Sequence, residues 1–483
     1  MGPLMLVLGL ACGPRDPQAL KEASTMADPL ATRPTVAAPA AFEPPVPAAL
    51  ALSNGVAVWL LEKPELPLVS VRIIFQGGSA SDPAAHPGLA TLTDEVMMHG
   101  AGERDAAAYA AFAEQQAVDV GILTGASSSV LYADSHADKL DTALDLLADA
   151  ALRPRLTQDD LDRVRDLQLG DIRQDLDDPR AVAPWVTARL YYGEGHPYAH
   201  PDVGTPDGLA GLTPADLSAS WSGRFSAARA HIVVVGAVEA DTLIAALEAR
   251  FAALPAGTAA PEIPPPAGIS DGPRLVLVDN PGATQSALRV VMPGWSAHDP
   301  DLAAGDLATT VLGGTFTSRL NRLMREEKGY TYGARASANP GRSFGTVVAS
   351  SSVEKDSTAE GLTDMLSTLE AAAESGFTDE ELVKAQSANR TALISAVGGR
   401  ARTAGALVRL VRQGHSTDRL ITELAAEQAV TAGQLRGAWA PRADLSHALI
   451  LVVGDLSEIR ASVEQAVPGD WEVVDKMPPP RAQ

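Results

Sequence analysis

The sequence has one cysteine, a deficit of basic side chains and no long hydrophobic run. The single cysteine, Cys12, excludes an internal disulfide and a zinc site built from cysteines. Lysine and arginine number 38 against 60 aspartate and glutamate, so the net charge is −22. This charge repels a phosphate backbone and makes nucleic-acid binding a poor expectation. Apolar runs stay short of the roughly 18 residues that a membrane-spanning helix needs.

What is present indicates a folded chain of several domains. Its 483 residues are 46% hydrophobic and 20% charged, which is typical of globular proteins. The length is about three times that of an average domain, so core size is not limiting.

The N-terminus suggests export. Leu4–Ala11 is a short apolar run directly before Cys12, and a Pro/Ala-rich stretch continues to Ala48. This layout resembles a bacterial lipoprotein signal, in which the cysteine receives the lipid. Another export signal and a frayed end without function are the alternatives. We therefore expect residues 1–48 to be a leader and disordered linker, and the protein to be periplasmic or anchored to the outer membrane of a Gram-negative bacterium.

Two stretches of the chain repeat the same order of elements. Runs of β-branched and aliphatic residues predict strands at 56–61, 68–75 and 231–236, and again at 274–278, 285–291 and 447–454. Arg72 and Arg289 occupy matching strands at an offset of 217, and the closing glycines Gly236 and Gly454 differ by 218. Leu161 and Leu382, in matching acidic helix starts, differ by 221. We infer a duplicated unit of about 220 residues.

The duplication sets the predicted domains. A proline-rich linker at 254–273 separates an N-terminal domain at 49–253 from a C-terminal domain at 274–483. Helical periodicity at 105–113, 139–152, 157–173 and 358–373 predicts helices between the strands. We expect an α+β fold in which each sheet carries helices on one face.

Several strings resemble the insulinase/pitrilysin family of zinc peptidases, which includes the mitochondrial processing peptidase and its bacterial relatives. They are GGSASD at 77–82, PGLA at 87–90, GHPY at 195–198, LGGTFTSRL at 312–320 and LMREEKGYTY at 323–332. The resemblance covers about residues 49–474. It implies two homologous domains, each a mostly antiparallel sheet with packed helices, that together form half of a clamshell.

The family's zinc motif, His-x-x-Glu-His, follows the Gly-Leu-Ala string, and this sequence departs from it. Thr91 and Glu95 stand at the histidine positions and Asp94 at that of the general base. The position of the downstream ligand falls near Asp171. These are hard oxygen donors, whereas zinc prefers nitrogen and sulfur, so no zinc is expected in this chain. The acidic positions could instead hold Ca²⁺ or Mg²⁺, or form a solvated acidic remnant, which we favour.

Other histidines have simpler interpretations. His99 lies eight residues after Thr91 and is expected at a helix end. His196 and His200 are separated by four positions, but Pro197 argues for a loop rather than a metal-binding helix face.

The family resemblance also implies a substrate-binding pair in the second domain. There an arginine and a tyrosine hold the substrate backbone and stabilise the oxyanion, and Arg325 and Tyr332 match best, with Tyr330 as the alternative phenol. A structural Arg–Glu pair and a packed tyrosine are the competing interpretation.

These features predict a non-catalytic subunit. The chain would pair with a separate peptidase subunit that carries an intact His-x-x-Glu-His and the zinc, and would act on a peptide or unfolded protein. A stand-alone binding or scaffold protein of the cell envelope is the alternative, and an active peptidase with an atypical site is the third.

Overall fold

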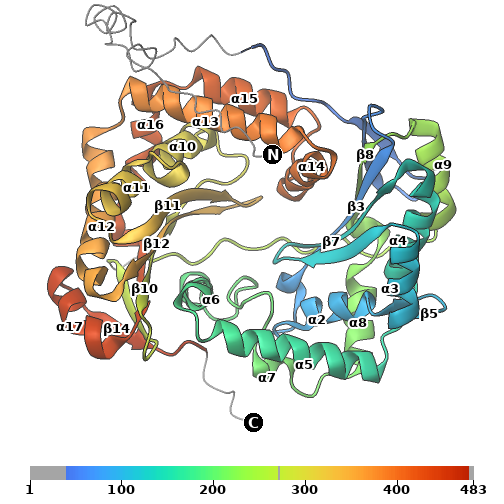
Figure 1. Cartoon of the computed structure of the whole chain (residues 1–483), viewed down its shortest axis with the longest axis horizontal. Coiled ribbons are helices and arrows are strands. Elements are labelled where there is room, and N and C mark those ends of the chain that lie inside the picture. Colours follow the sequence, from blue (N-terminus) through green and yellow to red (C-terminus); the bar gives the residue numbers. More distant parts are fainter. Residues whose placement is uncertain (1–39, 270–271, 478–483) are drawn as a thin grey trace, which may run out of the picture. The chain divides into compact units, whose positions relative to one another are not determined.

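The computed structural model describes residues 40–269 and 272–477, which excludes Cys12 and the lipoprotein-like signal. The described residues from Pro44 onward belong to one compact unit. Among the described residues, no helix is both long and apolar enough to span a bilayer. The fold is α+β and contains two six-stranded sheets (Figure 1).

The first sheet has the strand order β1-β2-β8-β3-β7-β6. Its strands are β1 (Ala48–Ala51), β2 (Ala57–Glu62), β3 (Leu68–Gln76), β6 (Asp119–Thr124), β7 (Ser128–His136) and β8 (Ala230–Gly236). All neighbours are antiparallel except β2 and β8. A short hairpin of β4 (Gly100–Ala101) and β5 (Arg104–Asp105) lies outside this sheet.

The second sheet repeats this arrangement, with the order β11-β12-β10-β13-β9-β14. Its strands are β9 (Arg274–Asp279), β10 (Gln285–Pro293), β11 (Thr331–Pro340), β12 (Gly345–Glu354), β13 (Leu449–Gly454) and β14 (Trp471–Val474). Read from the opposite end, β9, β13, β10, β12 and β11 correspond to β2, β8, β3, β7 and β6. Only the outermost strand differs, because β1 enters from the N-terminal side and β14 from the C-terminal side.

A pair of tryptophans shows the duplication at the level of single hydrogen bonds. The indole N–H of Trp221 donates to the carbonyl of Ala151 at 2.8 Å. The indole N–H of Trp439 donates to the carbonyl of Leu369 at 3.0 Å. Both donors and both acceptors are 218 positions apart, so the two halves are homologous, as the sequence predicted.

Helices cover the outer face of each sheet. In the first half, α3 (Ala106–Gln115), α4 (Leu140–Leu152) and α9 (Ala240–Phe251) pack there, and in the second half α10 (Leu302–Thr309), α12 (Thr358–Ser375), α16 (Ala432–Trp439) and α17 (Leu456–Ala466) do. The burial of apolar side chains between helix and sheet is the main stabilising term. The predicted helices at 105–113, 139–152 and 358–373 are confirmed.

The inner faces are covered too, which corrects the expectation of helices on one face only. Helix α6 (Pro179–Tyr192) of the first half packs on β10 and β13, and α14 (Arg400–Gln413) of the second half packs on β3 and β8. Val182 and Val186 of α6 share one buried cluster with Val291, Leu451 and other residues of the second sheet. Sequence periodicity identifies an apolar helix face but not the sheet that receives it, so this exchange of helices was missed.

The remaining helices lie around the zinc-motif positions of the first half and around the core of the second half. They are α2 (Leu89–Met97), α5 (Gln158–Asp175), α7 (Pro206–Leu209), α8 (Pro214–Arg224), α11 (Arg319–Asn321), α13 (Asp379–Val397) and α15 (Arg419–Ala429). Thr157 caps α5 by accepting a hydrogen bond from the backbone of Asp160, and Thr378 caps the matching α13 in the same way. Helix α2 packs against α5 and α8 through a small apolar cluster.

Candidate functional site

Helix α2 carries the positions of the zinc motif, and its start is fixed by Asp82. The Asp82 carboxylate accepts hydrogen bonds from the backbone N–H groups of Gly88 and Ala90, both at 2.7 Å. Gly88 has φ +97°, and a Cβ there would lie 2.8 Å from the Cα of Gly204, so this position favours glycine. Burial raises the pKa of Asp82 to about 7, although the two backbone hydrogen bonds oppose the shift.

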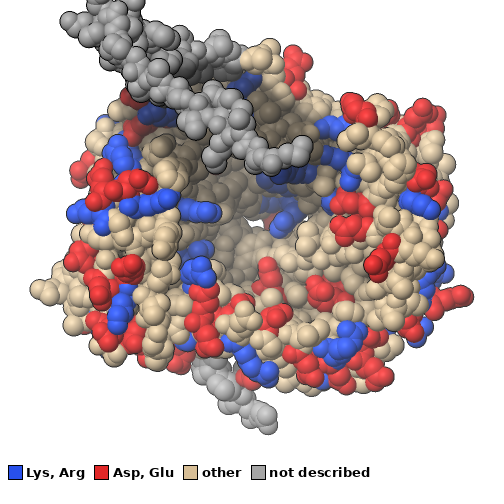
Figure 2. All heavy atoms as spheres, in the orientation of Figure 1, with Lys and Arg blue, Asp and Glu red and all other residues tan. Residues whose placement is uncertain are grey.

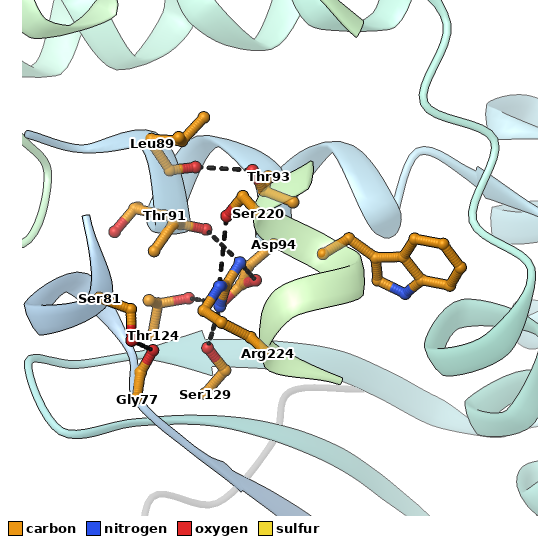
Figure 3. Close-up of polar contacts among 12 residues, drawn as sticks. Gly77, Ser81, Leu89, Thr91, Thr93, Asp94, Thr124, Ser129, Ser220 and Arg224 are labelled. Carbon is orange, nitrogen blue, oxygen red and sulfur yellow. Dashed lines mark hydrogen bonds and ion pairs between the residues drawn. The ribbon is translucent and has the colours of Figure 1, made fainter. Parts of the chain in front are cut away.

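Asp94 stands at the position of the general base and points into the protein interior. Its carboxylate lies 2.7 Å from Nη2 of Arg224 on α8, with side-chain exposures of 0% and 4%. Thr124 donates a hydrogen bond to it at 2.7 Å, and Ser129 donates another. Arg224 also donates to the hydroxyl of Ser129 at 2.8 Å (Figure 3).

This network changes the interpretation of Asp94. We expected a solvated acidic remnant, but the side chain is fully buried and paired, so that expectation is wrong for this residue. A buried carboxylate whose oxygens are occupied by a guanidinium and two hydroxyls has no contact with solvent through which to activate a water. Removing one partner of such a pair leaves an uncompensated buried charge and costs about 3–5 kcal/mol.

The other three motif positions differ in their contacts and exposure. The Thr91 hydroxyl donates to the backbone carbonyl of Asp202 at 2.6 Å. Glu95 is exposed, and so is Asp171 on α5. Among residues 40–269 and 272–477, no three histidine, cysteine, aspartate or glutamate side chains are grouped as a metal site. A hydroxyl and carboxylates are a poor donor set for zinc, which prefers nitrogen and sulfur. Asp94 is occupied by Arg224 rather than available to Ca²⁺ or Mg²⁺.

The histidines that we weighed as ligands have structural surroundings. His196 accepts a hydrogen bond at Nδ1 from the backbone N–H of Tyr198 (3.0 Å), and its Nε2 lies 2.8 Å from the carbonyl of Pro264. Both ring nitrogens are thus used. His196 and His200 lie in a loop after α6, as predicted, and His99 follows the end of α2.

The proposed substrate-binding residues of the second half differ in exposure. Tyr332 at the start of β11 is 89% exposed. Tyr330 is half-buried against the core of the second half, so it is the less suitable phenol of the two. The Arg325 guanidinium lies 4.2 Å from the ring centroid of Phe316, which is itself 59% exposed, and 3.5 Å from the carboxylate of Glu326. This stacking holds the arginine at the surface.

Comparison with known proteins now identifies the family. Residues 57–192 match the family model described as insulinase (peptidase family M16), and residues 211–389 match the model described as the peptidase M16 inactive domain. The chain belongs to the M16 family. The fold agrees with this, as a peptidase M16 inactive domain from Pseudomonas fluorescens superimposes with a TM-score of 0.78 at 26% identity, over 84% of this chain and 97% of that one.

Some M16 relatives are named as zinc proteases and another is named as a non-peptidase homolog. An uncharacterized zinc protease of Mycobacterium tuberculosis is 26% identical over 71% of this chain and 78% of its own. A non-peptidase homolog, YmxG of Helicobacter pylori, is 24% identical over 57% of this chain and 63% of its own. A zinc protease of Mycobacterium leprae is 27% identical, and the match spans 63% of its length. Similarity to these relatives therefore does not show whether this chain is catalytic. That question depends on the residues at positions 91–95.

Sequence reasoning assigned the zinc-motif positions from the family resemblance, but it missed Arg224, which pairs with Asp94, and Phe316, which stacks on Arg325. Arg224 lies 130 positions after Asp94, in a helix that gives no metal-site signal. Phe316, which stacks on Arg325, was read only as part of the LGGTFTSRL string. A faint signal for Arg224 existed, since Arg442 occupies the matching place in the second half at an offset of 218.

Proposed function

We propose that this chain is a non-catalytic M16 subunit that supplies substrate-binding groups to a separate M16 peptidase. The observation that carries the proposal is the buried ion pair of Asp94 and Arg224, which occupies the position of the general base with a structural interaction. The zinc and the attacking water would belong to the partner, which would carry an intact His-x-x-Glu-His.

The second half supports a retained role in substrate binding. Tyr332 is almost fully exposed, and Arg325 is held at the surface by Phe316. A guanidinium and a phenol are donors suited to developing negative charge on a substrate carbonyl. One relative, 22% identical over 42% of this chain, is named mitochondrial-processing peptidase subunit beta, and that name describes a protein that works as one of several subunits.

Reconstitution tests the proposal. The tagged full chain is purified from its native cells after mild cross-linking, and co-purifying M16 peptidases with an intact motif are identified. The candidate is then assayed on an unfolded peptide with and without the chain. We expect zinc-dependent cleavage that rises when the chain is added, and a lower kcat when the chain carries Arg325→Gln or Tyr332→Phe.

Arg322→Gln is the matched control, because Arg322 lies in the same helical segment (Arg322–Glu327) and its side chain is 70% exposed. It should leave the stimulated rate unchanged. If no M16 peptidase co-purifies and the chain instead captures a different envelope protein, the scaffold alternative is correct. Membrane or periplasmic localisation remains part of this proposal and rests only on the sequence of residues 1–48.

A further inference from the structure

One row of residues crosses the second sheet and contains two arginines. The register places Arg335 of β11 opposite Ser350 of β12, Ser350 opposite Arg289 of β10, and Arg289 opposite Leu451 of β13. Neighbouring strands are about 4.8 Å apart, so the Cα atoms of the two arginines are separated by about 10 Å, with a serine between them.

Both arginines belong to the inner face of the sheet. Leu288 and Val290 lie in the outer core, whereas Ala287 and Val291 lie in the cluster beneath α6, so alternation places Arg289 on the inner side. Ala334 and Ala336 belong to the outer core, which puts Arg335 between them on the same inner side.

The homologous row of the first half is neutralised. Arg72, the counterpart of Arg289 at an offset of 217, forms an ion pair with Asp134 at 2.8 Å and lies 5.4 Å from the ring centroid of Tyr132. Arg400 of α14 also approaches Asp134, at 3.6 Å. This cation is therefore enclosed by a carboxylate and an aromatic ring.

The second half has lost both partners. Ser350 and Ser352 occupy the positions of Tyr132 and Asp134 at an offset of 218. The Nε of Arg289 is buried and has no hydrogen-bond partner among the described residues. Arg335 is exposed, and within the described part of the chain its side chain forms no ion pair or hydrogen bond. Arg289 as a whole is half-buried. A buried guanidinium N–H is normally paired, so its unpaired Nε points to a missing anion.

Helix α6, which covers part of this row, adds no acid to it. The charged residues of α6, which packs on β10, are Arg180 and Arg189. Burial lowers the pKa of Arg289, and Tyr192 at the end of α6 opposes this shift. Figure 2 shows that one face is hollowed and that Lys and Arg side chains gather at the hollow over β11 and α14. Arg289 and Arg335 thus place two cations on the inner side of the second sheet although the whole chain carries −22.

We propose that Arg289, Ser350 and Arg335 form a carboxylate-binding row that selects acidic peptides. A guanidinium presents two parallel N–H donors to a carboxylate, and the serine hydroxyl between the arginines donates a further hydrogen bond. Two acidic groups spaced along an extended peptide would each meet one arginine. This inference adds the chemistry of the substrate to the proposed function. It rests on the proposed function only in assuming that the ligand is a peptide.

Calorimetry on the purified full chain tests the site without any peptidase partner. Four ten-residue peptides are titrated: an alternating Glu/Ala peptide with blocked ends, its Gln/Ala and Lys/Ala counterparts, and the Gln/Ala peptide with a free C-terminal carboxylate. We expect the Glu/Ala peptide to bind at least about tenfold more tightly than the blocked Gln/Ala and Lys/Ala peptides, and less tightly as salt rises. If the free C-terminus alone reproduces this binding, the carboxylate recognised is the terminal one.

Three variants assign the binding to the row. Arg335→Gln changes an exposed residue and should weaken binding of the Glu/Ala peptide about tenfold. Ser352→Asp restores to Arg289 the counter-ion that Asp134 gives Arg72, and should also weaken it. Arg460→Gln, on the outer helix α17, is the control and should have no effect. Equal affinity for the Glu/Ala and blocked Gln/Ala peptides, or an undiminished affinity in both row variants, would overturn the proposal.

The two proposals fail separately. If the chain does not bind acidic peptides, stimulation of a partner peptidase would still support the subunit role. Failure to find a partner would leave the calorimetric result unchanged.

Discussion

The carboxylate of Asp94 lies 2.7 Å from the guanidinium of Arg224, and neither side chain is more than 4% exposed. This contact joins α2 to α8 where active M16 peptidases place a general base.

The first prediction concerns the stability of this pair. Asp94→Ala leaves Arg224 buried without its counter-ion, so we expect the free energy of unfolding to fall by about 3–5 kcal/mol. Chemical denaturation followed by circular dichroism measures it. Glu464→Ala, which breaks the exposed i,i+4 pair with Arg460, is the control and should change stability by less than about 1 kcal/mol. Equal effects of the two variants would contradict the structural role of Asp94.

The second prediction separates metal binding from catalysis. Thr91→His with Glu95→His places two imidazoles four residues apart on one side of α2, and we expect zinc binding to rise above that of either single variant. Peptide hydrolysis should remain absent, because Asp94 stays paired with Arg224. Metal analysis and cleavage of an unfolded peptide provide the two readouts. Zinc-dependent turnover by the double variant would show that Asp94 is available as a base.

The third prediction concerns the exchanged helices. Leu407 on α14 is fully buried, so Leu407→Ala should lower the free energy of unfolding by about 2–5 kcal/mol. Since α6 and α14 each pack on the sheet of the other half, we expect one unfolding transition rather than two. Scanning calorimetry tests both points. Val383→Ala, at a site that is 63% exposed on α13, is the control, and a separate early transition of one half would contradict the account.

The sequence predicted much of this fold and less of the site. Strands and helices were predictable because alternating and helical periodicities depend on neighbouring residues, and the duplication repeats each pattern in the second half. Contacts between residues far apart in the sequence were not predictable. The partner of Asp94 is 130 positions away, and nothing local to α6 says that its apolar face is buried on β10.

The same limit applies to single side chains in the site. The Arg-Glu string suggested a pair, and the Arg325 guanidinium does lie 3.5 Å from the Glu326 carboxylate. The same guanidinium also lies over Phe316, which no spacing rule indicates. The choice between Tyr332 and Tyr330 depended on how far each side chain is exposed, which the sequence does not show. Tyr332 lies within an irregularity in β11, between Thr331 and Ala334.

The fourth prediction concerns pH. Burial raises the pKa of Asp82 to about 7 and that of Glu427 also to about 7, from ordinary values near 4. Each group therefore binds its proton more tightly in the folded chain, so its contribution to stability is lost as pH rises from about 4 to about 7. We expect the free energy of unfolding to decline across this interval and the decline to be smaller in Glu427→Gln. Denaturant titrations at pH 5 and pH 7.5 measure it, and an increase of stability with pH that the variant leaves unchanged would contradict the assignment.

The most direct test of the central claim is the zinc content of the unaltered chain. The protein is expressed alone, dialysed to remove adventitious metal, and analysed by mass spectrometry for zinc per chain. A donor set of Thr91, Glu95 and Asp171, with Asp94 bound to Arg224, predicts a value near zero. A value near one zinc per chain, retained after dialysis, would contradict the account and place a functional metal site in a chain that we describe as non-catalytic.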